Sequence, residues 1–548
     1  MTSNLSNPTY TLYPMKNRKI FYVVVLCLFV SLKQQVFSQS FKDKELNISL
    51  NELKLISAID LIKTKYVDTV NENKLVETAI IEMLKGLDPH SSYLTAEEVK
   101  EMNEPLHGNF EGIGVSFNIL NDTIFVINAI PGGPSEKLGI LSGDKIIEID
   151  QKNVAGIGIT NKDVFSKLRG EKGTKVTVSI KRRNEKNLID FTIIRDKIPI
   201  FSLDASYMIN KETGYIKLNR FSETTGTEFD SAIFKLKSQH MQNLILDLTG
   251  NGGGYLDKAV YLANQFLEKG KMIVYTKGVH SEGVHSPNHA YISAGEGSFQ
   301  SGKLVVLIDE SSASASEILA GAIQDWDRGT IIGRRSFGKG LVQQQLELPD
   351  GSMLKLTIAR YYTPTGRLIQ KSYKEGVDEY EKDLANRYKH GELSNKDSIH
   401  FSDSLKYFTL VKKRLVYGGG GIMPDIFVAL DTADNTEYFS SIIRKGTLNK
   451  FVLNYIDTHR EELKRNYPVF SSFDKNFSID NQILDDLVAF AKKEGISENK
   501  DQFQKSKKQI VNLLKAYIAR DVWDTNEFFE IMNQDNPVIL KALETLNQ

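Results

Sequence analysis

The sequence contains a single cysteine, Cys27, among its 548 residues. This residue lies in an apolar stretch close to the N-terminus, so a mature chain that begins after the stretch has no thiol. The preceding residue, Leu26, is not the small residue that a lipid-attachment site requires. Disulfide bonds, thiol catalysis and cysteine-based metal sites are therefore excluded from the mature chain.

Net charge is also absent, because 69 basic residues balance 69 acidic ones. The chain has no basic stripe with interleaved aromatic residues, and we therefore expect no nucleic acid partner. A hydrophobic content of 41% and a charged content of 25% are typical of soluble globular proteins. With 548 residues the chain is too long for one hydrophobic core, which predicts a multidomain protein.

The apolar run of residues 20–32 is too short to span a bilayer comfortably. It follows a basic cluster of Lys16, Arg18 and Lys19, and this order is typical of a signal peptide. We predict a signal peptide over residues 1–38, with Met15 as an alternative start. An uncleaved anchor is the competing interpretation, so membrane association through the N-terminus stays open.

Hydrophobic periodicity divides the rest of the chain into four regions. Residues 46–102 have a helical pattern, and residues 108–196 have short β-type runs with two short helices. From residue 213 strands and helices alternate, which predicts an α/β layer architecture, and after residue 425 the pattern is helical and charged. We expect an N-terminal helical domain at residues 41–105, a small β-barrel-like module at 106–197, an α/β domain at 198–430 and a helical region at 431–548.

Ser314 stands between a buried-type strand, residues 304–308, and an amphipathic helix. A serine at such a turn can be exposed while the amides of the helix N-terminus point at a developing oxyanion, as a nucleophile requires. Capping is the alternative, because serine is a favoured N-cap and Glu317 follows three positions later, as in a capping box. On this feature alone, capping is the favoured interpretation.

Lys339 lies in a glycine-rich segment that follows a β-type run. Gly333, Gly338 and Lys339 satisfy part of a phosphate-binding motif. Gly340 replaces the hydroxyl residue that holds Mg²⁺ in that motif, and no helix pattern follows at once, so we reject a nucleotide site. A lysine between glycines and beside Phe337 can instead be packed away from water, which lowers its pKa and makes the neutral amine available as a base.

A serine and a lysine together form a known hydrolytic dyad. Residues 312–318, residues 324–325 and residues 337–343 resemble the C-terminal processing peptidases, also called tail-specific proteases. The resemblance implies a crotonase-like α/β peptidase core in which Ser314 is the nucleophile, Lys339 is the general base and Gln343 orients the lysine. No metal and no organic cofactor is required.

The resemblance covers approximately residues 53–425 and implies that the β module is a PDZ domain. Arg169 matches a family arginine that links the ligand-bound PDZ domain to the active site, which implies a regulatory role. In PDZ domains one loop captures the carboxylate of a peptide C-terminus in backbone amides while the peptide adds a β-strand. Here this loop is expected at Gly112, Ile113, Gly114 and Val115.

One departure from the family is Thr249, because relatives usually have arginine at this position. The glycine-rich loop that follows is expected to supply the amides of Gly252 and Gly253, which with the amide of Ala315 form the oxyanion hole. A tight strand-to-helix turn is the alternative, and the glycine spacing is wrong for a dinucleotide loop. Asp325 matches a family position near the site, with a supporting role and a surface role as alternatives.

Three histidines, His280, His285 and His289, define a rival site, either for a metal ion or for the base of a Ser/His/Asp triad. Neither is favoured, because residues 278–302 are polar, glycine-rich and without clear periodicity, as in a mobile loop. His90 has no nucleophile and no carboxylate set near it in the sequence, and we expect it to be structural.

The sequence thus predicts a serine endopeptidase that hydrolyses peptide bonds of exported proteins. Expected partners are unfolded or C-terminally tagged protein substrates and peptide C-termini, while homo-oligomer formation stays open. The signal peptide predicts export, and the resemblance implies the periplasm, with association with the inner membrane left open. A binding scaffold that has lost catalysis is the alternative, motivated by Thr249. Whether the dyad is assembled at rest also stays open.

Overall fold

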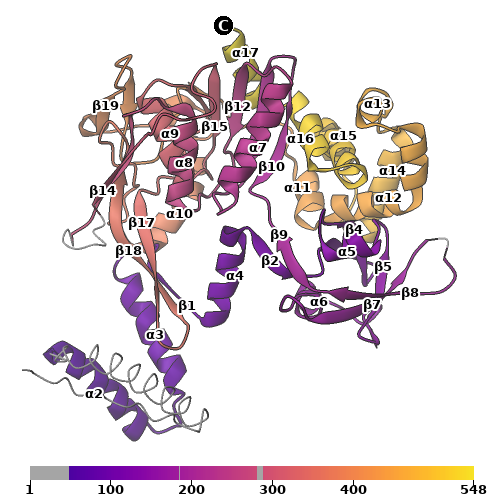
Figure 1. Cartoon of the computed structure of the whole chain (residues 1–548), viewed down its shortest axis with the longest axis horizontal. Coiled ribbons are helices and arrows are strands. Elements are labelled where there is room, and N and C mark those ends of the chain that lie inside the picture. Colours follow the sequence, from indigo (N-terminus) through magenta and orange to yellow (C-terminus); the bar gives the residue numbers. More distant parts are fainter. Residues whose placement is uncertain (1–48, 184, 280–287) are drawn as a thin grey trace, which may run out of the picture. The chain divides into compact units, whose positions relative to one another are not determined.

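The computed structural model describes residues 49–548 except residue 184 and residues 280–287 (Figure 1). The chain divides into two compact units, Met1–Glu82 and Met83–Gln548. The predicted signal peptide at residues 1–38 lies outside the described residues. No helix among those described is long and apolar enough to cross a membrane.

The first unit contains helix α2, Leu50–Lys65, and most of helix α3, Glu72–Lys85. A capping box begins α2, because the Ser49 amide donates to Glu52 Oε2 at 2.6 Å and the Glu52 amide donates to Ser49 Oγ at 3.2 Å. α2 buries none of its residues. The helical pattern predicted for this part of the chain is confirmed.

The second unit opens with strand β1, Ser92–Leu94, and helix α4, Ala96–His107. Thr95 and Glu98 form the capping box that begins α4. Gly108 ends the helix at φ +69°, a left-handed conformation that glycine adopts at little cost.

Residues 109–199 form the module for which the sequence predicts a PDZ domain. Its elements are β2 Asn109–Gly112, β3 Val115–Leu120, β4 Thr123–Ala129, α5 Pro134–Leu138, β5 Lys145–Ile149, β6 Lys152–Asn153, α6 Asn161–Leu168, β7 Lys175–Lys181, β8 Ile189–Ile194 and β9 Asp196–Pro199. The sheet has the order β3-β4-β5-β7-β8, with β6 paired to β5, while β2 pairs with β9. Alternate residues of the strands, such as Ile124 and Val126, are fully buried and share a core with Val164 of α6.

A parallel sheet with helices on both faces forms the α/β domain. Its elements are β10 Leu203–Met208, β11 Thr213–Leu218, α7 Thr225–Ser238, β12 Asn243–Asp247, α8 Leu256–Phe266, β15 Leu304–Ile308, α9 Ala315–Asp325, β16 Thr330–Gly333 and β21 Ile426–Phe427. The strand order is β10-β11-β12-β15-β16-β21, and only β10 runs antiparallel to its neighbour. Leu246 and Val306 share a buried core with residues of α7, α8 and α9. These three helices lie on one side of the sheet (Figure 1). The predicted α/β layer architecture is confirmed.

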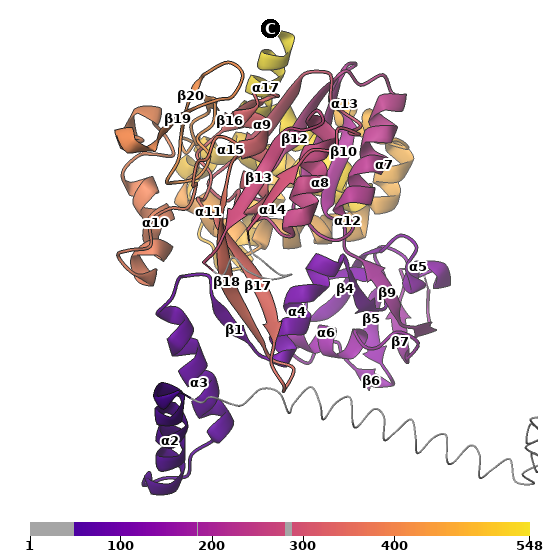
Figure 2. The same ribbon diagram turned by 60° about the vertical axis from the view of Figure 1, so that its left-hand side comes forward.

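A second sheet carries a long hairpin that the sequence analysis did not predict. Its elements are β13 Met272–Lys277, β14 His289–Ile292, β17 Leu341–Glu347 and β18 Met353–Tyr362. The sheet order is β1-β18-β13-β14, and β17 pairs with β18 alone. Figure 2 shows the β17–β18 hairpin next to β1 and α4. The hairpin is followed by α10 Val377–Lys389, η1 Lys396–Ser398, η2 Asp403–Leu405, β19 Lys406–Phe408 and β20 Leu415–Tyr417.

The C-terminal region is helical, as predicted. Its helices are α11 Glu437–Arg444, α12 Thr447–Asn466, α13 Phe470–Asn476, α14 Asn481–Lys493, α15 Lys500–Val522, α16 Thr525–Gln534 and α17 Pro537–Asn547. These helices pack against the rest of the chain, because Ile539 of α17 lies on the second face of the parallel sheet. Leu453 of α12 is buried against Leu120 and Phe125 of the β module, and Lys145 forms an ion pair of 2.9 Å with Asp457.

Candidate active site

Ser314 is the N-cap of α9 and follows the turn that ends β15. Its φ of 57° and ψ of −112° lie in a region that residues other than glycine rarely adopt. The turn is held by Asp309 Oδ1, which accepts hydrogen bonds from the amides of Ser311 at 3.0 Å and Ser312 at 3.1 Å. Backbone strain of this kind is typical of functional sites, where surrounding bonds enforce it.

The buried carboxylate of Glu317 joins the Ser314 turn to the Lys339 loop. Its Oε2 accepts hydrogen bonds from the amide of Ser314 at 2.8 Å and from the amide of Lys339 at 2.9 Å. Its Oε1 accepts from the Ser336 hydroxyl at 2.6 Å and from the Gly338 amide at 2.7 Å. Burial raises the pKa of Glu317, while these hydrogen bonds oppose that shift because they stabilise the ionised form. One side chain therefore fixes the backbones of both residues.

Tyr361 of β18 makes a second connection between the same two residues. Its hydroxyl donates to the carbonyl oxygen of Ser314 at 3.1 Å and also to that of Lys339. The Tyr361 side chain is almost fully buried. The backbones of Ser314 and Lys339 are thus bound from both their amide and their carbonyl sides.

The side chains of Ser314 and Lys339 line a common cleft of about 580 Å³. Burial lowers the pKa of Lys339 to about 8, and the positive charge of Lys355 adds to this shift. The direction is the one that the sequence predicts. Among the described residues the Lys339 amine has no hydrogen-bond partner, so it is not joined to the Ser314 hydroxyl.

Gln343 of β17 lines the same cleft, but its amide group is engaged elsewhere. Gln343 Nε2 donates to Thr357 Oγ1 at 3.2 Å on the neighbouring strand, and Thr357 Oγ1 in turn donates to Asp88 Oδ1 at 3.1 Å. Asp88 belongs to the segment before β1, which pairs with β18. In this structure Gln343 is therefore bound to the hairpin rather than to Lys339.

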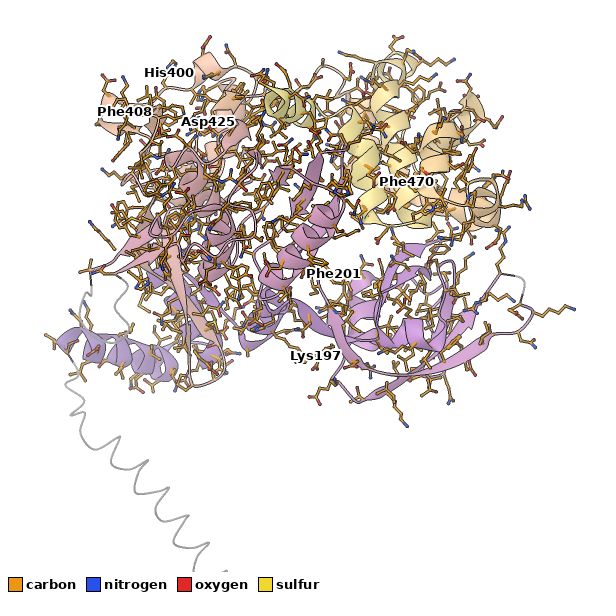
Figure 3. All side chains as sticks on the ribbon, turned by 45° about the horizontal axis from the view of Figure 1, so that its top comes forward. Lys197, Phe201, His400, Phe408, Asp425 and Phe470 are labelled. Atoms are coloured by element: carbon orange, nitrogen blue, oxygen red, sulfur yellow. The ribbon has the colours of Figure 1, made fainter. Side chains whose placement is uncertain are left out.

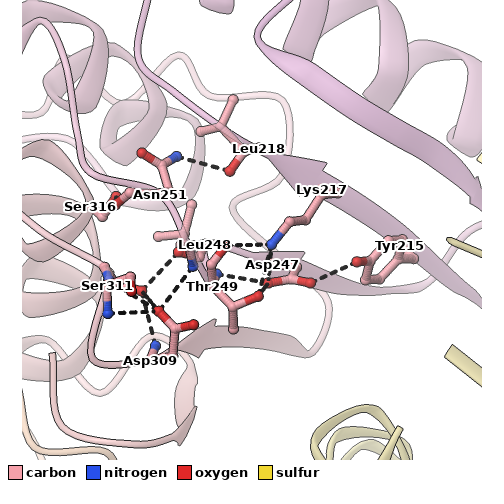
Figure 4. A network of polar contacts seen from close by, with 12 residues as sticks. Tyr215, Lys217, Leu218, Asp247, Leu248, Thr249, Asn251, Asp309, Ser311 and Ser316 are labelled. Atoms are coloured by element: carbon pink, nitrogen blue, oxygen red, sulfur yellow. Dashed lines mark hydrogen bonds and ion pairs between the residues drawn. The ribbon is translucent and has the colours of Figure 1, made fainter. Parts of the chain in front are cut away.

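Asn251 connects the glycine-rich loop to the turn that contains Ser314, in the network drawn in Figure 4. Its carbonyl oxygen accepts hydrogen bonds from the Ala313 amide at 3.0 Å and from the Ser316 hydroxyl at 2.9 Å. Its side-chain Nδ2 donates to the Leu218 carbonyl oxygen at 2.9 Å (Figure 4). The loop between β12 and α8 is thereby held against the start of α9.

The amides of this loop differ in their hydrogen bonding. The Gly253 amide donates to Asn251 Oδ1 at 2.9 Å, so in this structure it is engaged within the loop. The amides of Gly252 and Ala315 have no hydrogen-bond partner within the part of the chain that the structure describes, and both residues line the cleft. The structure therefore leaves two of the three predicted donors available.

Thr249, the departure from the family pattern, is integrated into a buried polar network (Figure 4). Thr249 Oγ1 donates to Asp247 Oδ1 at 2.7 Å and accepts a hydrogen bond from Lys217 Nζ at 2.8 Å. Lys217 also forms an ion pair of 3.1 Å with Asp247, whose other oxygen accepts from the Tyr215 hydroxyl at 2.6 Å. A cation from the neighbouring strand β11 thus lies beside Thr249 and holds the start of the loop.

The predicted carboxylate-binding loop at residues 112–115 has free amides. The carbonyl oxygen of Ile113 accepts hydrogen bonds from the amide and hydroxyl of Ser135, and that of Gly114 accepts from the Ile130 amide at 2.9 Å. The amides of Ile113 and Gly114 make no hydrogen bond to any residue that the structure describes. The loop therefore presents donors of the kind that a carboxylate requires.

Arg169 follows α6 and lies between aromatic rings of the β module and a carboxylate of α4. Its guanidinium is 4.8 Å from the ring centre of Phe110 and 4.9 Å from that of Phe165, and it forms an ion pair of 2.6 Å with Glu104. The Phe165 ring also meets the Phe117 ring of β3 at 5.5 Å, across the space between β3 and α6. Arg169 therefore connects the β3–α6 side of the module to α4.

The other residues singled out in the sequence have structural contacts. His90 lies against Tyr380, with 2.7 Å between Nε2 and the hydroxyl, and burial together with the nearby Lys339 charge lowers the pKa of His90 to about 4. Asp325 is fully buried in an ion pair with Arg367 at the far end of α9, so the surface role is wrong. His289 lies on β14, whereas His280 and His285 lie outside the described residues.

A second cavity of about 570 Å³ lies between η1 and β20 and is lined by His400 and Asp425 (Figure 3). Asp425 is engaged there by Gln324 Nε2 at 2.9 Å and by an ion pair with Arg414, and both contacts are structural. No group of three or more histidine, cysteine or acidic residues among the described ones could hold a metal ion.

Comparisons with known proteins agree with this geometry. Residues 212–379 match the model of peptidase family S41, residues 112–193 match that of the PDZ domain and residues 22–98 match that of the activating protease CtpB N-terminal domain. Residues 438–524 match a family of unknown function. The chain is 37% identical over 359 residues to the carboxy-terminal-processing protease of Bartonella bacilliformis, which covers 64% of this chain and 80% of that one.

The chain belongs to the carboxy-terminal-processing proteases of family S41. A further relative of this serine protease is the "Probable CtpA-like serine protease" of Staphylococcus aureus, 34% identical over 349 residues, which covers 63% of this chain and 67% of that one. A solved photosystem II D1 C-terminal processing protease is 25% identical with a TM-score of 0.35 and covers 70% of this chain and 95% of that one.

Sequence reasoning missed the roles of two residues in this protease. The spacing of Glu317 from Ser314 predicts a capping box, but its oxygens also bind Gly338 and Lys339, 21 and 22 positions away. These loop amides therefore hold a carboxylate of the protein itself and not a phosphate. No local pattern in the sequence indicates Lys355, because only the β17–β18 pairing brings it to the cleft.

Proposed function

We propose that Ser314 is the nucleophile of this protease and that Lys339 is its general base. The neutral Lys339 amine takes the proton of the Ser314 hydroxyl, and Ser314 Oγ attacks the scissile carbonyl carbon. The amides of Gly252 and Ala315 then stabilise the oxyanion of the tetrahedral intermediate. Collapse of the intermediate releases the amine product and leaves an acyl-enzyme, which water hydrolyses to return the serine.

The observation that carries this proposal is the shared carboxylate oxygen of Glu317. The same Oε2 accepts hydrogen bonds from the backbone amides of Ser314 and Lys339, so the two residues occupy fixed positions on one cleft. The lowered pKa of Lys339, to about 8, makes a usable fraction of neutral amine available near neutral pH.

The dyad side chains are joined, on this account, when substrate occupies the cleft. The Lys339 amine has no hydrogen-bond partner among the described residues, and Gln343 is bonded to Thr357. Gln343 would exchange Thr357 for Lys339 as the lysine turns toward Ser314. Catalytic hydrogen bonds that tighten only in the substrate complex are common in hydrolases.

The PDZ domain is proposed to bind the C-terminal tail of the substrate. The free amides of Ile113 and Gly114 suit a terminal carboxylate, and a peptide strand added along β3 must displace the contact between Phe117 and Phe165. Because Phe165 packs on Arg169, this displacement disturbs the ion pair between Arg169 and Glu104 of α4. Arg169 thereby has the regulatory role expected from the resemblance.

The alternative, a binding scaffold that has lost catalysis, is motivated by Thr249, but the contacts of Thr249 do not support it. Thr249 is held by Asp247 and Lys217, and the loop still presents the Gly252 amide to the cleft. The proposed substrates are exported proteins, unfolded or carrying a C-terminal tag. The signal peptide predicted at residues 1–38 supports export, and the proposed location, the periplasm, follows from the resemblance to the family.

The test compares cleavage of casein by the purified full chain and its variants. Ser314→Ala and Lys339→Met are expected to abolish turnover, with a loss of roughly 10⁴-fold or more. Ser311→Ala, in the same turn but exposed, is the matched control and should cleave like the wild type. Retained turnover in either dyad variant contradicts the proposed mechanism, and a wild type no more active than Ser314→Ala favours the scaffold. Full activity in Lys339→Met, lost only on replacing His280, His285 and His289 together, favours the histidine mechanism.

A further inference from the structure

The catalytic cleft contains a second lysine that the proposed mechanism does not use. Lys355 of β18 lines the cleft together with Ser314 and Lys339. Its ammonium group has neither a hydrogen bond nor an ion pair with any residue that the structure describes. Burial lowers the pKa of Lys355 below its ordinary value. A half-buried cation without a partner is costly, and so it calls for a ligand.

No carboxylate of the described residues is offered to this lysine, because no described aspartate or glutamate lines the cleft. The buried carboxylates whose charges act on the neighbouring Lys339 are already engaged. Glu317 binds four donors around the dyad, and Asp88 binds the amides of His90 and Ser91 and the Thr357 hydroxyl. The remaining polar groups of the cleft are the dyad, glutamine amides and backbone amides, while much of its wall is apolar. The cleft, as far as the structure describes it, therefore combines the amino groups of two lysines with no carboxylate.

The pairing of β17 with β18 places Lys355 opposite Gln345, two positions along the strand from Gln343. Gln343 is paired with Thr357 and Gln345 with Lys355, and of these four residues Gln343, Gln345 and Lys355 line the cleft. Residues two positions apart along a strand are roughly 7 Å apart. The same spacing separates side chains on one face of an extended peptide. A substrate chain in the cleft thus brings a group near the scissile bond to the Lys355 ammonium.

We infer that Lys355 forms an anion-binding subsite that accepts a carboxylate of the substrate close to the scissile bond. This carboxylate is supplied either by an aspartate or glutamate side chain or by the C-terminus of the substrate itself. The subsite is separate from the PDZ loop at residues 112–115, which binds a tail in another part of the chain. The inference rests on the proposed role of Ser314 and Lys339 in the same cleft.

The test uses the full-length enzyme and internally quenched peptides of one parent sequence. One set carries glutamate or glutamine at successive positions on each side of the cleaved bond. A second set ends at successive positions after that bond, with a free carboxylate or an amide. In the wild type, kcat/KM is expected to be about 10-fold or more higher for the anionic member of one pair, as for a charge-assisted hydrogen bond.

Substitutions at Lys355 test whether the preference for the anionic peptide depends on the charge of this residue. Lys355→Met and Lys355→Gln are expected to bring the ratio close to one, whereas Lys355→Arg keeps it because the charge remains. Arg360→Met, on the same strand but exposed and outside the cleft, is the control and should keep the wild-type ratio. A preference in the first peptide set identifies a side-chain carboxylate, and one in the second set identifies the C-terminus.

A second readout separates a binding role from a structural one. An anion at Lys355 cancels the positive charge that helps to keep the Lys339 pKa low, so the rise of kcat with pH, which reports the enzyme–substrate complex, should begin at higher pH for the anionic peptide. This difference should vanish in Lys355→Met. A ratio near one at every position in the wild type, or a ratio unchanged in Lys355→Met and Lys355→Gln, overturns the inference.

Ser314→Ala, measured alongside, keeps the two proposals apart. If Ser314→Ala still cleaves the peptides, the proposed dyad itself is wrong. If cleavage depends on Ser314 and the preference survives in both uncharged Lys355 variants, only the anion subsite is wrong.

Discussion

The backbones and the side chains of the proposed dyad are held very differently. Glu317 binds the amides of Ser314 and Lys339, and Tyr361 binds their carbonyl groups. In contrast, the Lys339 amine has no hydrogen-bond partner among the described residues, and Gln343 is bonded to Thr357. We call these backbone hydrogen bonds made by Glu317 and Tyr361 the frame of the site. The frame is thus complete, whereas the side chains of Ser314 and Lys339 are not hydrogen-bonded to each other.

This difference indicates where regulation can act. A buried network of charge-assisted hydrogen bonds is costly to rearrange, so the frame is expected to stay constant. The side chains of Lys339 and Gln343 can change partners without breaking that frame. The β17–β18 hairpin that carries Gln343 also contacts α4, where Gln345 Nε2 donates to Asn103 Oδ1 at 3.3 Å. A ligand that shifts α4 therefore needs to bias only the side-chain contacts.

The largest effect is expected from Glu317→Gln, which breaks the frame. Glutamine offers one acceptor oxygen and two N–H donors where four donors meet, so at least one buried donor loses its partner. We expect the free energy of unfolding to fall by about 2–4 kcal/mol, with turnover reduced at least tenfold. Urea unfolding and casein cleavage measure both quantities.

Glu268→Gln is the control for this change, because Glu268 forms only an exposed ion pair with Lys271. A Glu317→Gln protein as stable and as active as this control would show that the shared carboxylate does not hold the site.

A smaller effect is expected from Tyr361→Phe, which removes one hydroxyl from the carbonyl side of the frame. The loss of its hydrogen bonds to Ser314 and Lys339 should lower the free energy of unfolding by about 1–2 kcal/mol. Tyr362→Phe on the same strand is the matched control. Equal unfolding free energies for the two variants would contradict this part of the account.

The smallest effect is expected from Thr357→Val, which changes a side-chain contact of the site and leaves the frame intact. The substitution removes the hydroxyl to which Gln343 donates, so the Gln343 side chain is freer to bind Lys339. Without a PDZ ligand, kcat/KM is expected to rise by roughly 2–10-fold, which corresponds to one neutral hydrogen bond. Thr357→Ser keeps the hydroxyl and should behave like the wild type. A Thr357→Val enzyme that is no faster than Thr357→Ser would mean that this contact does not restrain the dyad.

Local features of the fold could be predicted from the sequence, because they depend on short patterns. The strand predicted at residues 304–308 is β15, with the same bounds, and Ser314 lies at the predicted strand-to-helix turn. Partners that are distant in the sequence could not be predicted. His90 meets Tyr380, 290 positions away, and the pairing of β17 with β18 decides that Lys355 lines the cleft.

The sequence also could not predict which backbone amides of the glycine-rich loop are free to bind an oxyanion. Gly252 and Gly253 are both glycines in the same loop, and they differ because the side chain of Asn251 accepts a hydrogen bond from the Gly253 amide. Glu317 shows the same limit, since its spacing from Ser314 predicts a cap but says nothing of the Lys339 loop.

The most direct test of the central claim is the pH dependence of kcat/KM for a peptide without ionisable side chains. Because only the neutral amine of Lys339 can accept the Ser314 proton, activity should rise about tenfold per pH unit at low pH and level off with a midpoint near 8. Lys339→Met should show no such rise. A midpoint near about 6.5, the ordinary value for histidine, or an unchanged profile in Lys339→Met would contradict the account.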